Sequence, residues 1–142
     1  MRNSINSLDV QLEEQTIDRT IEITVDDIST DVVMKHLSSF LHNNLEAVMS
    51  DYTNESVLIT QDSTYTGLEE IRAFFTGLIM HFPQQMSNLV LDQLVANKDL
   101  VYVVWHAKTP SLQVPIGSDT FIIKDSKIYQ QTFVGQLNFT NQ

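Results

Sequence analysis

The spacing of apolar residues changes at Pro83 in this 142-residue chain. Before Pro83 the apolar side chains mostly recur every three or four residues, as on one face of a helix. After it they mostly alternate, as along a strand. This order predicts an α+β fold, with three N-terminal helices packed on the concave face of a curved antiparallel sheet. The predicted helices cover residues 31–43, 44–52 and 67–82, and the predicted strands cover residues 56–60, 89–97, 100–108, 120–124 and 127–135.

Local signals support several of these boundaries. Asn44 can cap the second helix, and Thr66 with Glu69 forms a capping-box pattern at the start of the third. The segments NKD and KDS are typical of hairpin turns between the later strands.

The N-terminal region is less patterned. Residues 1–18 are polar, with scattered apolar side chains, which predicts a flexible arm before a single domain over residues 19–142. The segment TIEITV, residues 20–25, alternates and favours a short strand. A helix is the alternative, since Ile17, Ile21, Val25 and Ile28 also recur at helical spacing.

Composition narrows the classes of partner. The net charge of −10 argues against nucleic acid and against an anionic membrane surface. The chain has no cysteine, and it shows no signal-peptide pattern and no apolar run that could span a bilayer, so we expect a cytoplasmic protein. Its four histidines are too dispersed to propose a metal site, and no cofactor is predicted.

The strand over residues 100–108, LVYVVWHAK, is apolar on both faces. One face must meet the helices, and the apolar character of the other predicts a homodimer formed through the sheet. His106 shares a face with Tyr102 and Val104, opposite Trp105. It is a ligand contact if that face points inward and an interface residue if it points outward; the inward orientation is our expectation.

Asp119 stands at the mouth of a predicted strand, on the same face as Phe121 and Ile123. A carboxylate beside an apolar wall must lie at a wet rim, be hydrogen-bonded, or have a shifted pKa. We expect Asp119 to line a pocket rather than to end a strand in solvent.

The segment NNLEAVMSDYTNESVLITQDSTYTGLEEIRAFFTGLIMHFP, with VYVVWHAKT, PIG and DTFIIKDSKIYQQTFVGQL after it, resembles a known group of proteins. These are the SnoaL-like polyketide cyclases and the ketosteroid isomerases of the nuclear transport factor 2-like superfamily. The resemblance covers residues 31–137. It rests on the residue opening the second helix, a Y-x-x-[DE] pattern before the first strand, Gly67, Phe82-Pro83 and the closing hairpin. It implies a cone-shaped, cystatin-like fold.

The resemblance also assigns candidate catalytic residues. Asp119 falls at the second acid of the ketosteroid isomerases, where a desolvated aspartate can stay protonated and donate a hydrogen bond. His36 replaces their tyrosine, and Thr60 replaces their aspartate base and cannot take a proton from carbon. In SnoaL-like cyclases an aspartate near the end of the cone acts as the base with a histidine in support. Asp119 with His36 or His106 matches such a pair.

Each candidate has a structural alternative. His36 lies on the apolar face of its helix, where it is either a packed core residue or a donor or base facing the cavity. Asp62 shares a strand face with Thr60 and can stand in for the missing base, although a solvated loop carboxylate is the simpler interpretation. The expected pocket residues are Thr60, Asp62, Phe74, Phe121, Gln131 and Phe133.

Together these features predict a protein that binds a small apolar organic ligand in a hydrophobic pocket, and that isomerises or cyclises it by acid/base chemistry. The alternative is a non-catalytic ligand-carrier or association domain. An open cavity with Asp119 and a histidine close together favours the enzyme, whereas a cavity filled by phenylalanine side chains favours the alternative.

Overall fold

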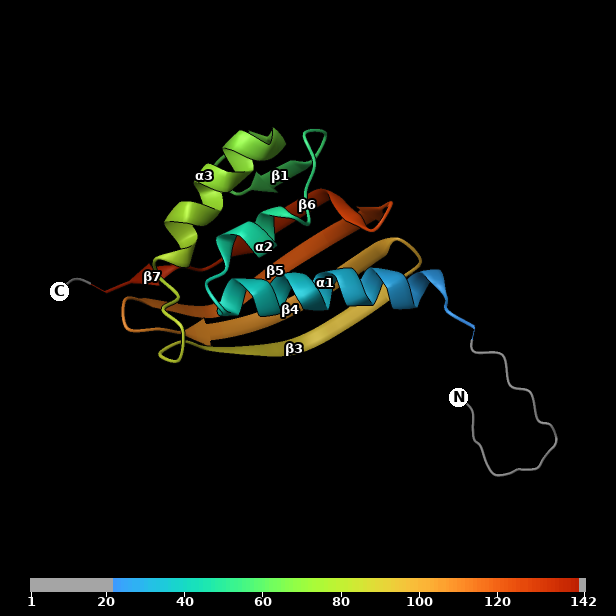
Figure 1. The fold of residues 1–142 in the computed structure, drawn as a ribbon. Helices are drawn as coiled ribbons and strands as arrows, with labels where there is room; N and C mark the ends of the chain where they lie inside the picture. The colour runs from blue at the N-terminus through green and yellow to red at the C-terminus, as the bar shows by residue number, and fades with distance from the viewer. Residues whose placement is uncertain (1–21, 141–142) are drawn as a thin grey trace, which may run out of the picture.

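A computed structural model describes residues 22–140. Three helices lie across one face of a curved, unclosed sheet, with α1 alongside β3 and β4 and α3 beside β1 (Figure 1). This arrangement confirms the predicted α+β class. The helices are α1 (Val25–Leu41), α2 (Leu45–Met49) and α3 (Gly67–Ile79), and the strands are β1 (Val57–Thr60), β2 (Thr64–Thr66), β3 (Asn88–Asn97), β4 (Leu100–Lys108), β5 (Leu112–Lys124), β6 (Lys127–Gly135) and β7 (Asn138–Phe139).

The sheet is mixed rather than purely antiparallel. Its order is β2-β1-β6-β5-β4-β3, and β7 pairs with β5. All described pairs are antiparallel except β1 with β6, which run parallel. Parallel neighbours need a long connection, and α3 with the β3–β5 meander supplies it here. The prediction of a wholly antiparallel sheet was therefore wrong at this one pair.

The helix α1 begins six residues earlier than predicted. Thr24 caps it, because the Thr24 hydroxyl accepts from the Asp27 amide at 3.1 Å and the Asp27 carboxylate accepts from the Thr24 amide at 3.3 Å. Val25 is helical and residues 22–24 belong to no strand, so the strand predicted over residues 20–25 is wrong in its described part. Residues 20 and 21, and the predicted arm over residues 1–18, lie outside the described residues.

The strand β5 begins eight residues before the predicted start. It contains Pro115, which has no amide hydrogen to donate to a neighbouring strand. The register between β4 and β5 shifts between Trp105 and Ala107, next to this proline, and such a bulge tolerates the missing donor. The predicted strand, which began at residue 120, therefore missed a first part of β5 that holds a proline at a bulge.

The start of α3 is close to the prediction, but its capping is different. The Thr66 side chain makes no capping hydrogen bond, and the Thr66 amide instead donates to Glu70 Oε1 at 2.8 Å. Gly67 has a φ of 83°, a conformation that glycine adopts without strain. The capping box between Thr66 and Glu69 is absent, whereas the predicted cap of α2 is present, since Asn44 Oδ1 accepts from the Ala47 amide at 3.0 Å.

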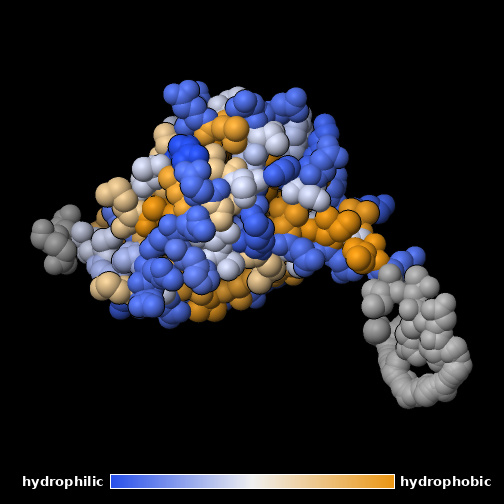
Figure 2. Space-filling view, in the orientation of Figure 1, coloured by the Kyte–Doolittle hydropathy of each residue, from blue (hydrophilic) through white to orange (hydrophobic). Residues whose placement is uncertain are grey.

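The core lies between the helices and the inner face of the sheet. On β4 this inner face carries Val101, Val103, Trp105 and Ala107, all buried. Most of the surface drawn in Figure 2 is hydrophilic, with hydrophobic side chains exposed where α1 begins, at the end next to the grey segment. No helix within residues 22–140 is long and apolar enough to cross a membrane.

Candidate functional site

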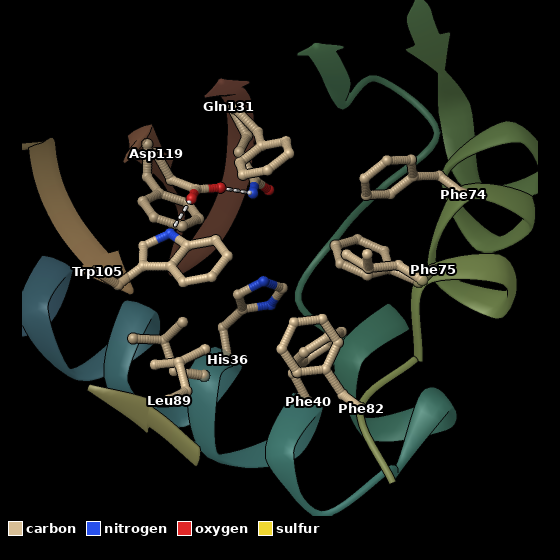
Figure 3. A pocket seen from close by; sticks show the side chains of 13 residues that line it. His36, Phe40, Phe74, Phe75, Phe82, Leu89, Trp105, Asp119 and Gln131 are labelled. Carbon is tan, nitrogen blue, oxygen red and sulfur yellow. Dashed lines mark hydrogen bonds between the residues drawn. The ribbon is translucent and has the colours of Figure 1, made fainter. Parts of the chain in front are cut away.

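A small cavity lies between α1, α3 and the inner face of the sheet (Figure 3). Its volume is about 50 Å³. A water molecule needs at least about 10 to 15 Å³ of such space, so the cavity has room for a few waters and not for a ring. Among residues 22–140, the polar side chains that line it are His36, Trp105, Asp119 and Gln131. The apolar lining residues are Leu37, Phe40, Phe74, Phe75, Leu78, Phe82, Leu89, Phe121 and Phe133.

Asp119 lies at the sheet side of the cavity and is buried. Trp105 Nε1 donates to Asp119 Oδ1 at 2.8 Å, and Gln131 Nε2 donates to Asp119 Oδ2 at 2.9 Å. Burial raises the pKa of Asp119, and these two hydrogen bonds only partly offset the rise. This is the partly dry, hydrogen-bonded carboxyl that the sequence pattern favours.

His36 enters the cavity from α1. The buried face of this helix carries Val33, His36 and Phe40 at helical spacing, so the apolar stripe itself carries the imidazole inward. Around it, the rings of Phe75 and Phe121 stand edge-on at centroid distances of 5.6 and 5.8 Å. His36 is 3% exposed, so its nitrogens must find partners within the protein or the cavity.

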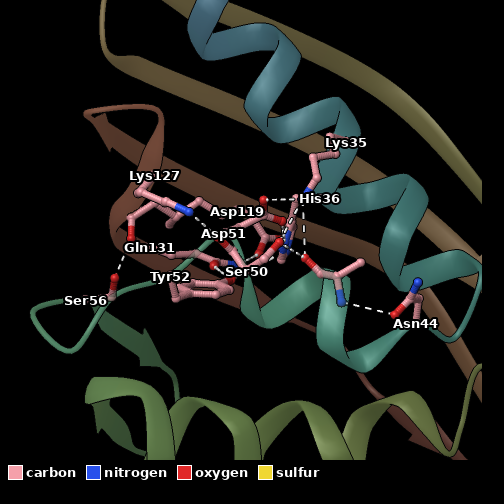
Figure 4. A network of polar contacts seen from close by, with 12 residues as sticks. Lys35, His36, Asn44, Ser50, Asp51, Tyr52, Ser56, Asp119, Lys127 and Gln131 are labelled. Carbon is pink, nitrogen blue, oxygen red and sulfur yellow. Dashed lines mark hydrogen bonds and ion pairs between the residues drawn. The ribbon is translucent and has the colours of Figure 1, made fainter.

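Behind His36 lies a buried carboxylate that connects the site to the surface (Figure 4). His36 Nδ1 lies 3.3 Å from Asp51 Oδ2, and Lys35 Nζ donates to Asp51 Oδ1 at 2.8 Å. Burial alone would raise the pKa of Asp51, but the hydrogen bonds from His36 and Lys35 outweigh it and lower that pKa. Asp51 is therefore an ionised acceptor at neutral pH.

Tyr52 joins the two halves of the network. Its hydroxyl donates to Gln131 Oε1 and lies 3.5 Å from His36 Nε2. Burial, with the nearby carboxyls of Asp119 and Asp51, raises the pKa of Tyr52 well above its ordinary value of 10.0, so the phenol keeps its proton. A polar chain thus runs from Asp51 through His36, Tyr52 and Gln131 to Asp119.

The position of Trp105 depends on a glycine in the neighbouring strand. A Cβ atom at Gly117 would lie 2.6 Å from two carbons of the Trp105 indole. The glycine therefore lets the ring lie against the β5 backbone and aim Nε1 at Asp119. The indole also stacks with Phe133, with ring centroids 5.9 Å apart.

The structure brings most of the expected site residues together. Asp119, His36, Phe74, Phe121, Gln131 and Phe133 all line the cavity. Thr60 and Asp62 do not: the Thr60 hydroxyl lies in the β1–β2 turn, where it accepts from the amides of Asp62 and Ser63, and Asp62 is exposed. Both residues belong to this turn and neither lines the cavity, so the expectation that Thr60 and Asp62 are pocket residues was wrong.

The expectation that His106 faces inward was also wrong. On β4 the more apolar set of side chains, including Trp105, faces the helices, which places His106 on the outer face with Tyr102. There His106 Nδ1 lies 2.8 Å from Asp92 Oδ2, and both side chains are nearly half exposed. His106 is not part of the cavity.

Three residues of the network were not predicted as site residues. Asp51 and Tyr52 looked like the end of a helix, and no feature of a single sequence pairs Asp51 with His36 from the preceding helix. The alternation along β4 placed Trp105 opposite His106, but nothing in the sequence indicated its bond to Asp119. Within residues 22–140, no group of three or more histidine and acidic side chains could hold a metal ion.

Comparisons with known proteins place the fold. No protein-family model matches the sequence, and no curated protein matches it. Among solved structures, a candidate ketosteroid isomerase from Kribbella flavida superposes with a TM-score of 0.67 at 11% identity, over 85% of this chain and 87% of that one. A candidate SnoaL-like polyketide cyclase from Shewanella denitrificans gives 0.65 at 13% identity, over 77% and 90%.

A third similar structure is described as an NTF2-like protein, after the nuclear transport factor 2-like fold. An NTF2-like protein of unknown function from Cytophaga hutchinsonii gives a TM-score of 0.62 at 10% identity, over 83% of this chain and 95% of that one. At such low sequence identities, the roles of individual residues in those proteins cannot be assigned to residues of this chain. The chain has the nuclear transport factor 2-like fold.

Proposed function

We propose that this protein binds a small, largely apolar organic molecule in the cavity and exchanges a proton with it through Asp119, with His36 in support. The observation that carries this proposal is a buried carboxyl with a raised pKa at the wall of an otherwise aromatic cavity. A carboxylate whose pKa is raised is a stronger base than an ordinary aspartate while it stays ionised. The candidate isomerase and cyclase among the structural neighbours are consistent with this chemistry.

Entry of a ligand requires movement at the rim. At about 50 Å³ the cavity is well below the roughly 300 to 1,000 Å³ of typical ligand pockets. Leu37, Phe74 and Leu78 line it and are only partly buried, so they are the side chains that can turn aside.

Deuterium exchange tests the proposal. With millimolar cyclopentanone in deuterated buffer, the protein should accelerate loss of the α-proton NMR signals, and Asp119→Asn should slow this exchange tenfold or more. Asp62→Asn is the matched control, because it neutralises the exposed aspartate once considered as an alternative base, and it should leave the rate unchanged. Exchange no faster than in buffer, or equal rates in the two variants, would refute proton transfer at Asp119.

The small size of the cavity favours one second candidate, a non-catalytic carrier or association domain. Its phenylalanine rings leave little free space, as expected if the cavity merely holds a small metabolite or a few waters. Native mass spectrometry of freshly purified protein separates the two: a retained small molecule without α-proton exchange supports the carrier.

We also propose that the protein is a homodimer through the outer face of the sheet. Neighbouring strands present exposed apolar side chains there: Val95 lies opposite Tyr102, and Val134 lies across Ser118 from Val104, which is half-buried. Tyr102 is 40% and Val134 56% exposed, and an apolar surface of this kind is commonly covered by a partner. The helices lie across the opposite face of the sheet (Figure 1).

Sedimentation checks the dimer. At micromolar concentration we expect twice the 16.2 kDa chain mass, and Tyr102→Glu should shift the protein to the monomer by placing a charge in the interface. Met80→Glu is the control, since Met80 is 75% exposed at the end of α3, a helix on the opposite face of the sheet. A single 16.2 kDa species for the unmodified chain would rule the dimer out.

A further inference from the structure

The nitrogen of His36 that faces Tyr52 has no hydrogen-bond donor among the described residues. Asp51 is ionised, so the His36 nitrogen beside it, Nδ1, must carry a hydrogen and donate it. In the neutral imidazole Nε2 is then a bare acceptor. Its neighbour at 3.5 Å is the oxygen of Tyr52, whose single proton goes to Gln131.

The other polar side chains of the cavity supply no hydrogen-bond donor to His36 Nε2. Trp105 Nε1 and Gln131 Nε2 each direct a hydrogen at Asp119, so both donors are engaged by one carboxylate. The cavity therefore presents acceptors, at His36 Nε2 and at Asp119. A buried acceptor without a donor is unfavourable, and a ligand that brings a donor removes that cost.

We propose that His36 Nε2 is the acceptor for a hydroxyl group of the ligand, which makes a small hydroxylated aromatic ring, a phenol, the class of molecule that this cavity selects. The inference deepens the proposed function and rests on ligand binding in this cavity. The cavity has no room for a ring until the rim side chains Leu37, Phe74 and Leu78 move aside. The ring would then lie among Phe75, Phe121 and the stacked pair of Trp105 and Phe133. Asp51 is the positioning residue, since it fixes which His36 nitrogen carries the hydrogen.

Nitrogen-15 NMR of the unmodified protein tests the tautomer directly. In the neutral imidazole of His36 the hydrogen should be on Nδ1, and Nε2 should be unprotonated. Two protonated nitrogens, or a hydrogen on Nε2 alone, would overturn the inference without needing any variant.

Ligand preference is the second test, with phenol compared against fluorobenzene, a ring of similar size without a hydroxyl. Trp105 is the chain's single tryptophan and lines the cavity, so its fluorescence reports binding. Phenol should bind about tenfold more tightly than fluorobenzene, as one hydrogen bond to a buried acceptor implies. Equal affinities, or failure of both rings to bind, would overturn the ligand class. The proposed proton transfer is judged separately, by the cyclopentanone exchange.

Asp51→Asn should abolish the preference for phenol over fluorobenzene. Lys35 attracts the amide oxygen, so the amide NH₂ faces His36 Nδ1 and the hydrogen moves to Nε2, which then donates instead of accepting. Asp92→Asn is the matched control, because it changes the other aspartate bonded to a histidine Nδ1, on the outer face of the sheet. Loss of the preference in both variants, or in neither, would contradict the role of Asp51.

Discussion

Replacement of Asp51 by alanine is expected to lower the free energy of unfolding by about 3 kcal/mol. The Asp51 side chain is 5% exposed and accepts hydrogen bonds from Lys35 and His36. Alanine leaves the buried His36 Nδ1 without its acceptor, whereas Lys35, which is half exposed, can return to water. Urea unfolding followed by Trp105 fluorescence measures the loss.

The same substitution has a defined pH dependence. The folded-state pKa of Asp51 is below its ordinary value of 3.8, so the folded protein holds this carboxylate ionised more readily than the unfolded chain does. Its stabilisation is fully present above about pH 4 and is lost as pH falls through the lowered pKa. The gap between wild type and Asp51→Ala should thus close in acid. Asp92→Ala, in the exposed pair with His106, should cost at most about 0.5 kcal/mol, and an equal cost for both would contradict the account.

Gly117→Ala is expected to cost about 2 kcal/mol and to disturb the cavity. The added methyl would lie 2.6 Å from the Trp105 indole, which must move away from β5 and so weaken its hydrogen bond to Asp119. The Trp105 fluorescence emission should shift in this variant, and urea unfolding should show the lower free energy of unfolding.

Gly77→Ala is the control for this substitution. Gly77 lies within α3 and has no atom within 4 Å of an added Cβ, so alanine there should stabilise the protein by up to about 1 kcal/mol. The two glycine-to-alanine substitutions should therefore change the free energy of unfolding in opposite directions. A neutral Gly117→Ala would show that the indole position does not depend on the glycine.

The α+β class and most elements could be predicted from apolar spacing alone. Strands β4 and β6 match their predicted ranges residue for residue, because uninterrupted alternation and hairpin turns specify both their ends. Prediction failed where a local signal was overridden. Pro115 stands inside β5 at a bulge, and the alternating residues before Val25 are followed by a helix that starts at the Thr24 cap.

The site was predictable only one residue at a time. Alternation placed Asp119 beside Phe121, and helical spacing placed His36 on the buried face of α1. Which of these groups touch depends on long-range packing that no local pattern encodes, as between Tyr52 and Gln131, 79 residues apart. Both faces of β4 are apolar, so the sequence could not decide which of them the helices cover. In the structure they cover the face that carries Trp105, and His106 lies on the other.

Asp119 is the centre of the proposed site, and the sign of its pKa shift has a consequence for stability. The folded-state pKa is raised above 3.8, so the folded protein favours the protonated acid. Folding therefore becomes less favourable as pH rises from about 3.8 through the raised value. Asp119→Asn lacks this titration, so its stability relative to wild type should rise over the same interval.

Carbon-13 NMR titration of the Asp119 carboxyl tests the central claim most directly. The account predicts a midpoint clearly above the ordinary 3.8, with Trp105 fluorescence changing at the same pH because its indole nitrogen donates to that carboxyl. An aspartate in a short unstructured peptide, titrated under the same conditions, serves as the reference. A midpoint for Asp119 at or below the ordinary 3.8 would contradict a carboxyl held in a dry cavity, and the proposed proton transfer with it.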